Sequence, residues 1–396
     1  MIMTASKLPN IDFDKTNKKI IDTIDNIKNF FTTKGYIPTS TSLIEDSDIF
    51  TRKSGVRLSS KLYSFVDPGG RSVSLRPEFT TSIIKNFLKI YEPDDLPLKF
   101  QYNGPVFAYN PNQIDGLEQR NQIGIELIGQ NGLEIDSDIL YMSIKALELI
   151  GIDKTKIKIG NLEFLNKILT VFELSNPAIN LILNNLQSIQ SNKITTEDII
   201  YKAEKLGIFN NTKNNPQNTP DKENKLDFSD IVLKEHLNST VGQRSPDDII
   251  KRLFKKRKYS DNSQALKDAI FLTKSLVKID APPEKALNET RKILQENSIP
   301  EKLLIPLEEI SNSIEKTIGP NANINLVPAH IRGLEYYTGI IFDINYQNKS
   351  ELIHLGGGGR YDELVQILGG REMVPALGFA YSLENIQKVL EIINGK

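Results

Sequence analysis

The stretch Gln122-Ile123-Gly124-Ile125-Glu126-Leu127 decides the fold of this 396-residue chain. Side chains of a β-strand point alternately to its two faces, so one face here is wholly apolar and the other carries an amide, a glycine and a carboxylate. Gly124 removes a side chain between the two polar groups, which leaves room above the sheet for a small cationic or hydrogen-bonding ligand. A solvent-facing strand with a bulge is the alternative.

Segments on either side of this strand predict a sheet with helices packed against it. Ile20, Ile24, Ile27 and Phe31 fall on one helical stripe, and Gly35 marks the expected end of that helix. From residue 61 to 109 short alternating runs are broken at residues 67–70 and 103–105, a pattern typical of antiparallel strands joined by turns. Residues 156–160 predict another strand, and strand texture with many glycines returns over 321–359. The expected fold class is α+β.

The middle of the chain favours helices. We expect residues 173–300 to form a mainly helical insertion that divides an α+β core made of residues 1–172 and 301–396. Residues 210–224 are polar and of low complexity, and they lack the apolar side chains needed for packing. They predict a mobile loop within the insertion.

Composition excludes several classes of protein. Lys and Arg number 49 and Asp and Glu 50, so the formal charge of −1 lacks the basic excess with which a whole protein attracts nucleic acid. There is no Cys and there are only three well-separated His, so we expect no metal site and no cofactor. No run of eighteen apolar residues and no signal-peptide pattern occurs, and we expect a cytoplasmic protein that does not contact a membrane.

Two further polar segments have both a structural and a functional interpretation. Glu78 follows Arg76-Pro77 at a strand end, where a carboxylate either caps the next helix or binds a ligand. Arg332 stands before the paired phenols Tyr336 and Tyr337, in front of an apolar strand. An arginine fork suits a carboxylate and a phenol suits a ring nitrogen, although aromatic pairs beside strands also belong to cores.

Two other segments are weak signals. Gly356 to Gly359 matches neither the phosphate-binding loop nor the dinucleotide-binding glycine pattern, so a tight turn is the expected structure. The basic run over residues 251–258 predicts a solvated helix face, with nucleic-acid contact as the lesser alternative.

The order and spacing of these segments resemble the catalytic domain of histidyl-tRNA synthetase, a class II synthetase. Residues 58–80 (LSSKLYSFVDPGGRSVSLRPEFT) resemble the segment that ends in the family's R-P-E-G-T motif, and residues 104–129 resemble its motif 2 hairpin. Residues 330–342 resemble its histidine-specific arginine segment, and 357–385 its glycine turn and motif 3 helix. The resemblance implies a class II aminoacyl-tRNA synthetase-like antiparallel sheet flanked by helices.

The resemblance also implies a histidine site, and it assigns each candidate residue a role. Glu126 and Tyr337 would meet the imidazole, Arg332 the carboxylate, and Glu78 and Gln122 the amino group, with Tyr336 beside them in the same site. Arg120-Asn121 stand where the family commonly has Phe-His, at the entrance to the same strand.

The chain departs from the synthetase at the positions that bind ATP. Phe107-Ala108-Tyr109-Asn110 stands at the family's F-R-Y-E position, and Asn385 stands where motif 3 ends in arginine. Only 11 residues follow Asn385, so we expect no anticodon-binding domain, which needs on the order of 100 residues. These departures predict a protein that does not form an adenylate and does not bind tRNA.

A synthetase fold with a histidine site but without ATP chemistry resembles the non-catalytic regulatory subunits of ATP phosphoribosyltransferase. That resemblance, which residues 241–246 also share, implies a short-form catalytic subunit as partner, histidine as effector and a homodimer within a hetero-oligomer. The alternatives are a truncated histidine–tRNA ligase, which is an enzyme, and a histidine-binding paralogue of another pathway.

Overall fold

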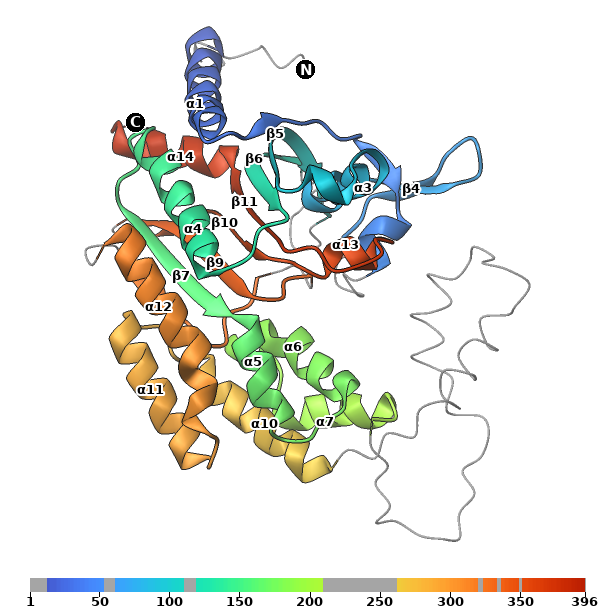
Figure 1. The fold of residues 1–396 in the computed structure, drawn as a ribbon, viewed down its shortest axis with the longest axis vertical. Helices are drawn as coiled ribbons and strands as arrows, with labels where there is room; N and C mark the ends of the chain where they lie inside the picture. The colour runs from blue at the N-terminus through green and yellow to red at the C-terminus, as the bar shows by residue number, and fades with distance from the viewer. Residues whose placement is uncertain are drawn as a thin grey trace, which may run out of the picture. The chain divides into compact units, whose positions relative to one another are not determined.

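The computed structural model describes residues 13–52, 61–109, 119–208, 262–319, 323–332, 336–348 and 351–395. The chain divides into two compact units, one of Met1–Lys167 with Ser275–Lys396 and the other of Ile168–Lys274. The described helices, drawn in Figure 1, are α1 (Phe13–Thr33), α3 (Thr80–Ile90), α4 (Leu133–Glu148), α5 (Leu162–Thr170), α6 (Asn176–Gln190), α7 (Thr196–Lys205), α10 (Ser263–Leu276), α11 (Pro283–Glu296), α12 (Ile305–Ile318), α13 (Leu364–Ile367) and α14 (Leu383–Ile393).

The first unit is built on a large sheet with the strand order β1-β5-β6-β11-β10-β9-β7-β8. A smaller sheet has the order β2-β4-β3. The strands are β1 (Ile37–Pro38), β2 (Ile44–Asp46), β3 (Ser64–Val66), β4 (Ser72–Leu75), β5 (Leu98–Phe107), β6 (Gln119–Ile128), β7 (Thr155–Asn161), β8 (Ile324–Leu326), β9 (Ile340–Gln347), β10 (Leu352–Arg360) and β11 (Ala376–Ser382).

The expected fold class is confirmed, and the sheet is mixed. Strands β5, β6, β11, β10, β9 and β7 pair antiparallel in that order, while β1 joins β5 and β8 joins β7 in parallel at the two edges. The predicted first helix ends at Thr33, and Gly35 follows in the left-handed region at φ 83°. The strand expected at 156–160 is β7.

Two predicted turns are strands instead. Residues 103–105 lie inside β5, which pairs with β6 from Leu98 to Phe107 without a break. Pro105 is tolerated there because β1 reaches only Phe100 and Gln101, so the other edge of β5 needs no N–H donor at Pro105. Gly356 to Gly359 lie in β10 between β9 and β11, where a side chain would collide with the backbone of a neighbouring strand.

One face of the large sheet forms the main core. The alternate residues Ile123, Ile125 and Leu127 of β6 are buried there, as the period of two predicts. Helices α1, α4, α12 and α14 supply the opposing apolar side chains (Figure 1). Phe31 of α1 meets Phe379 of β11 edge to face, with ring centroids 5.8 Å apart.

The opposite face of the sheet packs against α3 and α13. A second apolar cluster there includes Phe79, Phe87, Tyr102, Tyr336 and Tyr361. Its aromatic residues come from four separate segments of the chain, so they meet only when the sheet has formed. This face carries the candidate site.

The second unit contains helices α6 and α7 and most of α10. Ser175 caps α6, and Thr195 with Asp198 forms a capping box at the start of α7. The predicted insertion, 173–300, includes this unit except for residues 168–172, and it also includes α11, which packs with β8 and α12 of the first unit. The predicted loop at 210–224, the motif at 241–246 and the basic run at 251–258 lie outside the described residues.

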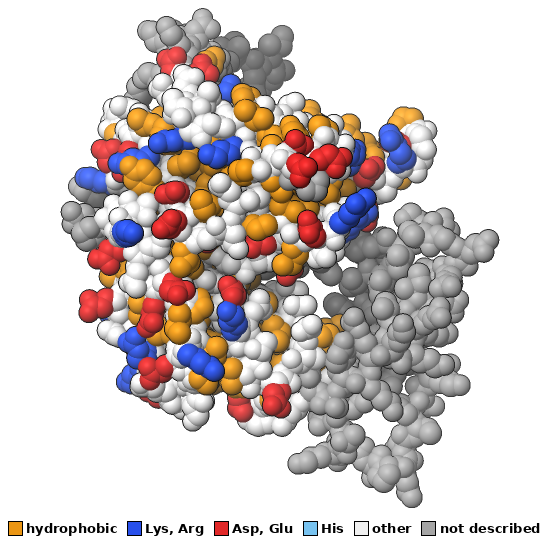
Figure 2. Space-filling model, in the orientation of Figure 1, with side chains coloured by type: hydrophobic (Ala, Val, Ile, Leu, Met, Phe, Trp, Pro, Cys, Tyr) orange, Lys and Arg blue, Asp and Glu red, His pale blue; other side chains and the backbone are white. Residues whose placement is uncertain are grey.

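Surface charge is mixed on the face shown in Figure 2, where Lys and Arg side chains lie among Asp and Glu side chains. This agrees with the balanced composition. Among the residues that the structure describes, no helix is long and apolar enough to cross a membrane.

Replacing Phe31 tests the contact between α1 and the sheet. Phe31 is fully buried, so Phe31→Ala should lower the free energy of unfolding by about 3–5 kcal/mol through lost burial and the cavity left behind. Urea unfolding followed by circular dichroism measures it. Asn29→Ala, on the exposed side of the same helix, is the matched control and should change stability by no more than about 0.5 kcal/mol. Equal losses in the two variants would contradict this account of the core.

Candidate functional site

The polar face of β6 is buried at Gly124 and Glu126 rather than exposed to solvent. β6 pairs without a register shift with β5 and β11, so the bulge alternative is wrong. Glu126 lies opposite Phe100 on β5 and Gly378 on β11, and its side chain is 1% exposed. Gln122 lies on the same face, nearer the strand's beginning, and is half-buried.

Three hydroxyl groups hold the Glu126 carboxylate. Thr80 donates to Oε1 at 2.6 Å, Tyr102 donates to the same oxygen at 3.2 Å, and Tyr361 donates to Oε2. Burial raises the pKa of Glu126 to about 8, against the opposing effect of the hydrogen bonds from Thr80 and Tyr361. Whether Glu126 is ionised near neutral pH therefore depends on the charge of any group that enters the site.

Glycines give these groups their space. A Cβ atom at Gly124 would lie 2.6 Å from the Tyr102 hydroxyl, and one at Gly378 would collide with the Glu126 carboxylate. The gap that Gly124 leaves above the sheet is thus occupied by the Tyr102 hydroxyl. The sequence predicts a ligand in the space above Gly124. In the structure the Tyr102 phenol fills this space and donates a hydrogen bond to Glu126.

Glu78 caps α3, as its position after a strand end predicts. Its carboxylate accepts hydrogen bonds from the Thr81 N–H at 3.1 and 3.2 Å, at the positive end of the helix. Burial raises the pKa of Glu78, because it outweighs the hydrogen bonds that favour the charged form. The capping interpretation is confirmed, and the role of Glu78 in binding an amino group stays a prediction.

Arg76 supports the same corner of the site. Its guanidinium donates to the carbonyl oxygens of Pro105 and Thr41, both at 2.8 Å, and lies 3.9 Å from the centre of the Phe79 ring. The Phe79 ring in turn stacks on Tyr102 with centroids 4.4 Å apart. This chain of contacts fixes the phenol that donates to Glu126.

Arg332 is held by a carboxylate that sequence reasoning missed. Asp343 of β9 forms an ion pair with Arg332, and His330 Nε2 lies 3.0 Å from Asp343 Oδ2. Burial would raise the pKa of Asp343, but the His330 hydrogen bond and the Arg332 charge keep it well below its usual range. An acid within the apolar run Ile340 to Ile344 was the available signal.

Of the two phenols, Tyr337 interacts with both Arg332 and Glu126, and Tyr336 packs beside it. Tyr336 is buried in the aromatic cluster, 5.7 Å from Tyr361 and 5.0 Å from Tyr337 between ring centroids. Burial raises the pKa of Tyr337 to about 12; Arg332 lowers that pKa and Glu126 raises it. The structure thus brings five of the six predicted residues together around Tyr337, with Gln122 farther along the strand.

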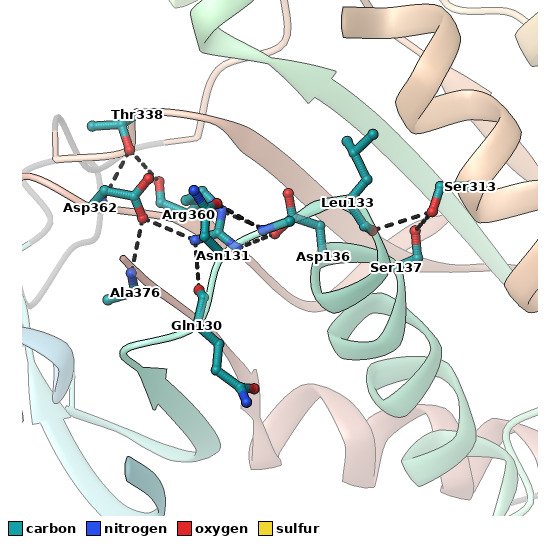
Figure 3. A network of polar contacts seen from close by, with 11 residues as sticks. Gln130, Asn131, Leu133, Asp136, Ser137, Ser313, Thr338, Arg360, Asp362 and Ala376 are labelled. Carbon is teal, nitrogen blue, oxygen red and sulfur yellow. Dashed lines mark hydrogen bonds and ion pairs between the residues drawn. The ribbon is translucent and has the colours of Figure 1, made fainter. Parts of the chain in front are cut away.

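Tyr361 reaches Glu126 because its neighbours are anchored on the other side. Arg360 donates to Asp136 at 2.9 Å through Nε and to Asp362 at 3.0 Å through Nη1, as Figure 3 shows. Asp362 also accepts the Ala376 N–H at 2.9 Å. These contacts fix Arg360 and Asp362, so the Tyr361 side chain between them points toward Glu126. The sequence analysis assigned no role to Arg360, Tyr361 or Asp362.

The positions that differ from the synthetase have local partners. Asn385 donates to the carbonyl oxygen of His354 at 2.8 Å, and Glu384 accepts from both the backbone N–H and the amide of Asn121. Ala108 follows the end of β5 and carries no polar group. The start of α14 is therefore joined to β6 and β10 by neutral and acidic groups.

A mixed sheet of this order, flanked by helices, is the catalytic-domain fold of class II aminoacyl-tRNA synthetases. The family model described as Histidyl-tRNA synthetase matches residues 14–204 and 217–386. The chain therefore belongs to the histidyl-tRNA synthetase family.

Relatives of known name show moderate similarity. The histidine–tRNA ligase of Sulfurisphaera tokodaii is 28% identical over 360 residues, which is 90% of this chain and 68% of that protein. The corresponding ligase of Metallosphaera sedula is 26% identical over 388 residues, 96% of this chain and 73% of that protein. The chain thus spans about two thirds to three quarters of their length.

Solved structures support the fold. An ATP phosphoribosyltransferase regulatory subunit/histidyl-tRNA synthetase from Bacillus halodurans C superposes with a TM-score of 0.61 at 20% identity, covering 98% of this chain and 83% of that one. A histidine–tRNA ligase subunit from Alicyclobacillus acidocaldarius has the same TM-score at 19% identity, with both chains covered completely. At these identities the likeness concerns the fold alone.

Removing Arg360 should be costly because it leaves buried acids without a cation. We expect Arg360→Met to lower the free energy of unfolding by about 3–5 kcal/mol, measured by urea denaturation. Lys388→Ala, which breaks the exposed ion pair with Glu351, is the control and should cost about 0.2–1 kcal/mol. The double variant Arg360→Met/Asp136→Leu should recover part of the loss. A loss for Arg360→Met as small as the control's would refute the anchoring role.

Proposed function

We propose that this protein is a non-catalytic regulatory subunit of ATP phosphoribosyltransferase, required for activity and for histidine feedback inhibition in the first step of histidine biosynthesis. One observation carries the proposal. The groups suited to histidine are assembled, whereas Ala108 and Asn385 stand where the synthetase has its two ATP-binding arginines.

Phosphate chemistry depends on cations held in advance against developing negative charge. Among the described residues of the site face, three arginines already have partners of their own. Arg76 donates to backbone carbonyls, Arg332 pairs with Asp343, and Arg360 pairs with Asp136 and Asp362. None of these three arginines stands at the positions of the two ATP-binding arginines, so they do not replace them, which disfavours adenylate formation.

Histidine fits the same site by its chemistry. Arg332 provides a fork for the ligand carboxylate, Glu126 and Tyr337 provide partners for a ring, and Glu78 provides negative charge for an ammonium group. A pocket that binds an amino acid without activating it acts by biasing a partner. The partner we propose is a short-form ATP phosphoribosyltransferase catalytic subunit, with which a homodimer of this chain forms a hetero-oligomer in the cytoplasm, without tRNA.

The name of the Bacillus halodurans structure supports this proposal, since it includes an ATP phosphoribosyltransferase regulatory subunit. The second candidate is a truncated histidine–tRNA ligase, an enzyme. It is favoured by the ligase names of the relatives at 24–28% identity. Adenylate formation distinguishes the two candidates.

We expect no histidine-dependent exchange of pyrophosphate into ATP above a no-protein blank, because the two phosphate-binding cations are replaced. Radiolabelled pyrophosphate and the purified chain are sufficient for the measurement. The Sulfurisphaera tokodaii ligase serves as positive control. A clear histidine-dependent rate would reject the regulatory assignment and favour the ligase.

Mixed with a short-form ATP phosphoribosyltransferase from the same organism, the chain should raise that enzyme's activity and make it sensitive to histidine. In this mixture Arg332→Gln should raise the histidine concentration needed for half-inhibition by roughly 10- to 150-fold, because a charge-assisted contact is worth about 1.5–3 kcal/mol. Formation of phosphoribosyl-ATP, followed by absorbance, reports both effects.

The matched control is Lys388→Gln, which removes an exposed cation of the same charge outside the site. It should leave histidine sensitivity unchanged. Equal sensitivity of wild type and Arg332→Gln would place the effector elsewhere. Catalytic-subunit kinetics unchanged by the wild-type chain, with no complex on gel filtration at micromolar concentration, would leave a histidine-binding paralogue of another pathway as the better hypothesis.

A further inference from the structure

Glu126 is a buried carboxylate surrounded by hydroxyl groups and aromatic rings. Across the described ranges no lysine, arginine or histidine side chain forms an ion pair with it. Buried carboxylates ordinarily have a cationic partner, because an isolated buried charge is expensive. The site is thus built for a negative charge whose counter-charge is not supplied by the residues around it.

The groups around the two carboxylate oxygens favour one form of Glu126. The hydroxyl oxygens of Thr80, Tyr102 and Tyr361 all lie within hydrogen-bond distance of these oxygens, and each hydroxyl has a single proton to donate. Accepting three hydrogen bonds suits the ionised form, which is an acceptor only. A protonated Glu126 would have to donate to one of these hydroxyl groups, which would then lose its role as donor.

Among the residues that the structure describes, the titratable groups that interact with Glu126 are acidic or phenolic. They come from the start of α3, the chain after α1, β5, the segment before β9 and the chain after β10, and they are Glu78, Tyr36, Tyr102, Tyr336, Tyr337 and Tyr361. Burial raises the pKa of each of these groups, and none of them carries a positive charge. Their ring faces favour a cation beside the carboxylate.

We propose that Glu126 and the imidazole of the bound histidine share one proton, so that the site holds the ligand as imidazolium against the ionised carboxylate. This inference rests on the proposed histidine site. It specifies the class of ligand as a ring that gains a proton near neutral pH. The hydroxyl cage then serves the bound state, and the entering ring supplies the missing counter-charge.

The number of protons held before and after binding predicts whether histidine binding releases or takes up protons. With the pKa of Glu126 at about 8 and that of a free imidazole at about 6.5, the empty site and free ligand together hold about 1.75 protons at pH 6 and about 0.5 at pH 8. The complex holds one. Binding should therefore release about 0.75 proton at pH 6 and take up about half a proton at pH 8. Histidine affinity should be greatest between these two pH values.

Titration calorimetry of the purified full chain with histidine, in two buffers of different ionisation enthalpy, measures this proton count. Histidine labelled with ¹⁵N in the ring provides a second measurement, since the nitrogen shifts distinguish imidazolium from neutral imidazole. We expect the bound ring to be imidazolium at pH 8, where the free ring is neutral. Zero proton uptake at pH 8, or a neutral bound ring, would overturn the inference.

The control variant is Glu126→Gln, which keeps the shape and removes the charge. In it the bound ring should be neutral at pH 8 and the proton uptake should disappear, while circular dichroism reports whether the variant is folded. If the variant does not fold, the ¹⁵N measurement on the wild-type chain still decides the question. Absence of any binding heat or shift change at both pH values would instead count against the proposed histidine site itself.

Discussion

The arrangement of this site depends on the hydrogen bonds that hold the buried Glu126 carboxylate. A charge at the middle of a sheet is stable only if its oxygens are satisfied, and the three donors come from the start of α3, from β5 and from the end of β10. Each donor is held by its own supports, which are the Phe79 stack for Tyr102 and the Arg360 ion pairs for Tyr361. Core packing on one face of the sheet and polar contacts on the other therefore converge on a single side chain.

A second charge centre complements the first. Arg332 and His330 meet Asp343 on β9, so the cationic end of the site has its own acid while the anionic end has only neutral donors. Such an asymmetric arrangement suits a zwitterionic ligand with a basic ring, because each end of the ligand finds a different electrostatic environment. Tyr337 lies between the two centres and responds to both.

The same fold can serve catalysis or regulation depending on a few cations. Membership of the histidyl-tRNA synthetase family follows from the match over most of the chain. Within that family, we propose that Ala108 and Asn385 alter the chemistry, while Asn385 forms an ordinary hydrogen bond to the backbone of β10. Function therefore resides in side chains placed on a shared sheet.

The sequence by itself determined the elements and the alternation on which the site is built. The helix through Ile27 and Phe31, the apolar face of Ile123 and Ile125, and the strand at 156–160 all follow from periodicity, because local side-chain direction is set by the backbone. Sequence pattern also singled out Glu78, Glu126, Arg332, Tyr336 and Tyr337, the resemblance assigned them to a histidine site, and the fold brings them together.

Only the tertiary structure decided which partner each of these residues has. Residues 103–105 and the glycines at 356–359 are typical of turns, yet they are strands, because pairing with β6, β9 and β11 outweighs local preference. Tyr361 is distant in sequence from Glu126, and Asp343 meets Arg332 across the segment that leads into β9. Contacts between strands from separate parts of the chain, together with burial, determine both the Arg332 ion pair and the pKa of Glu126, and neither is encoded in a local pattern.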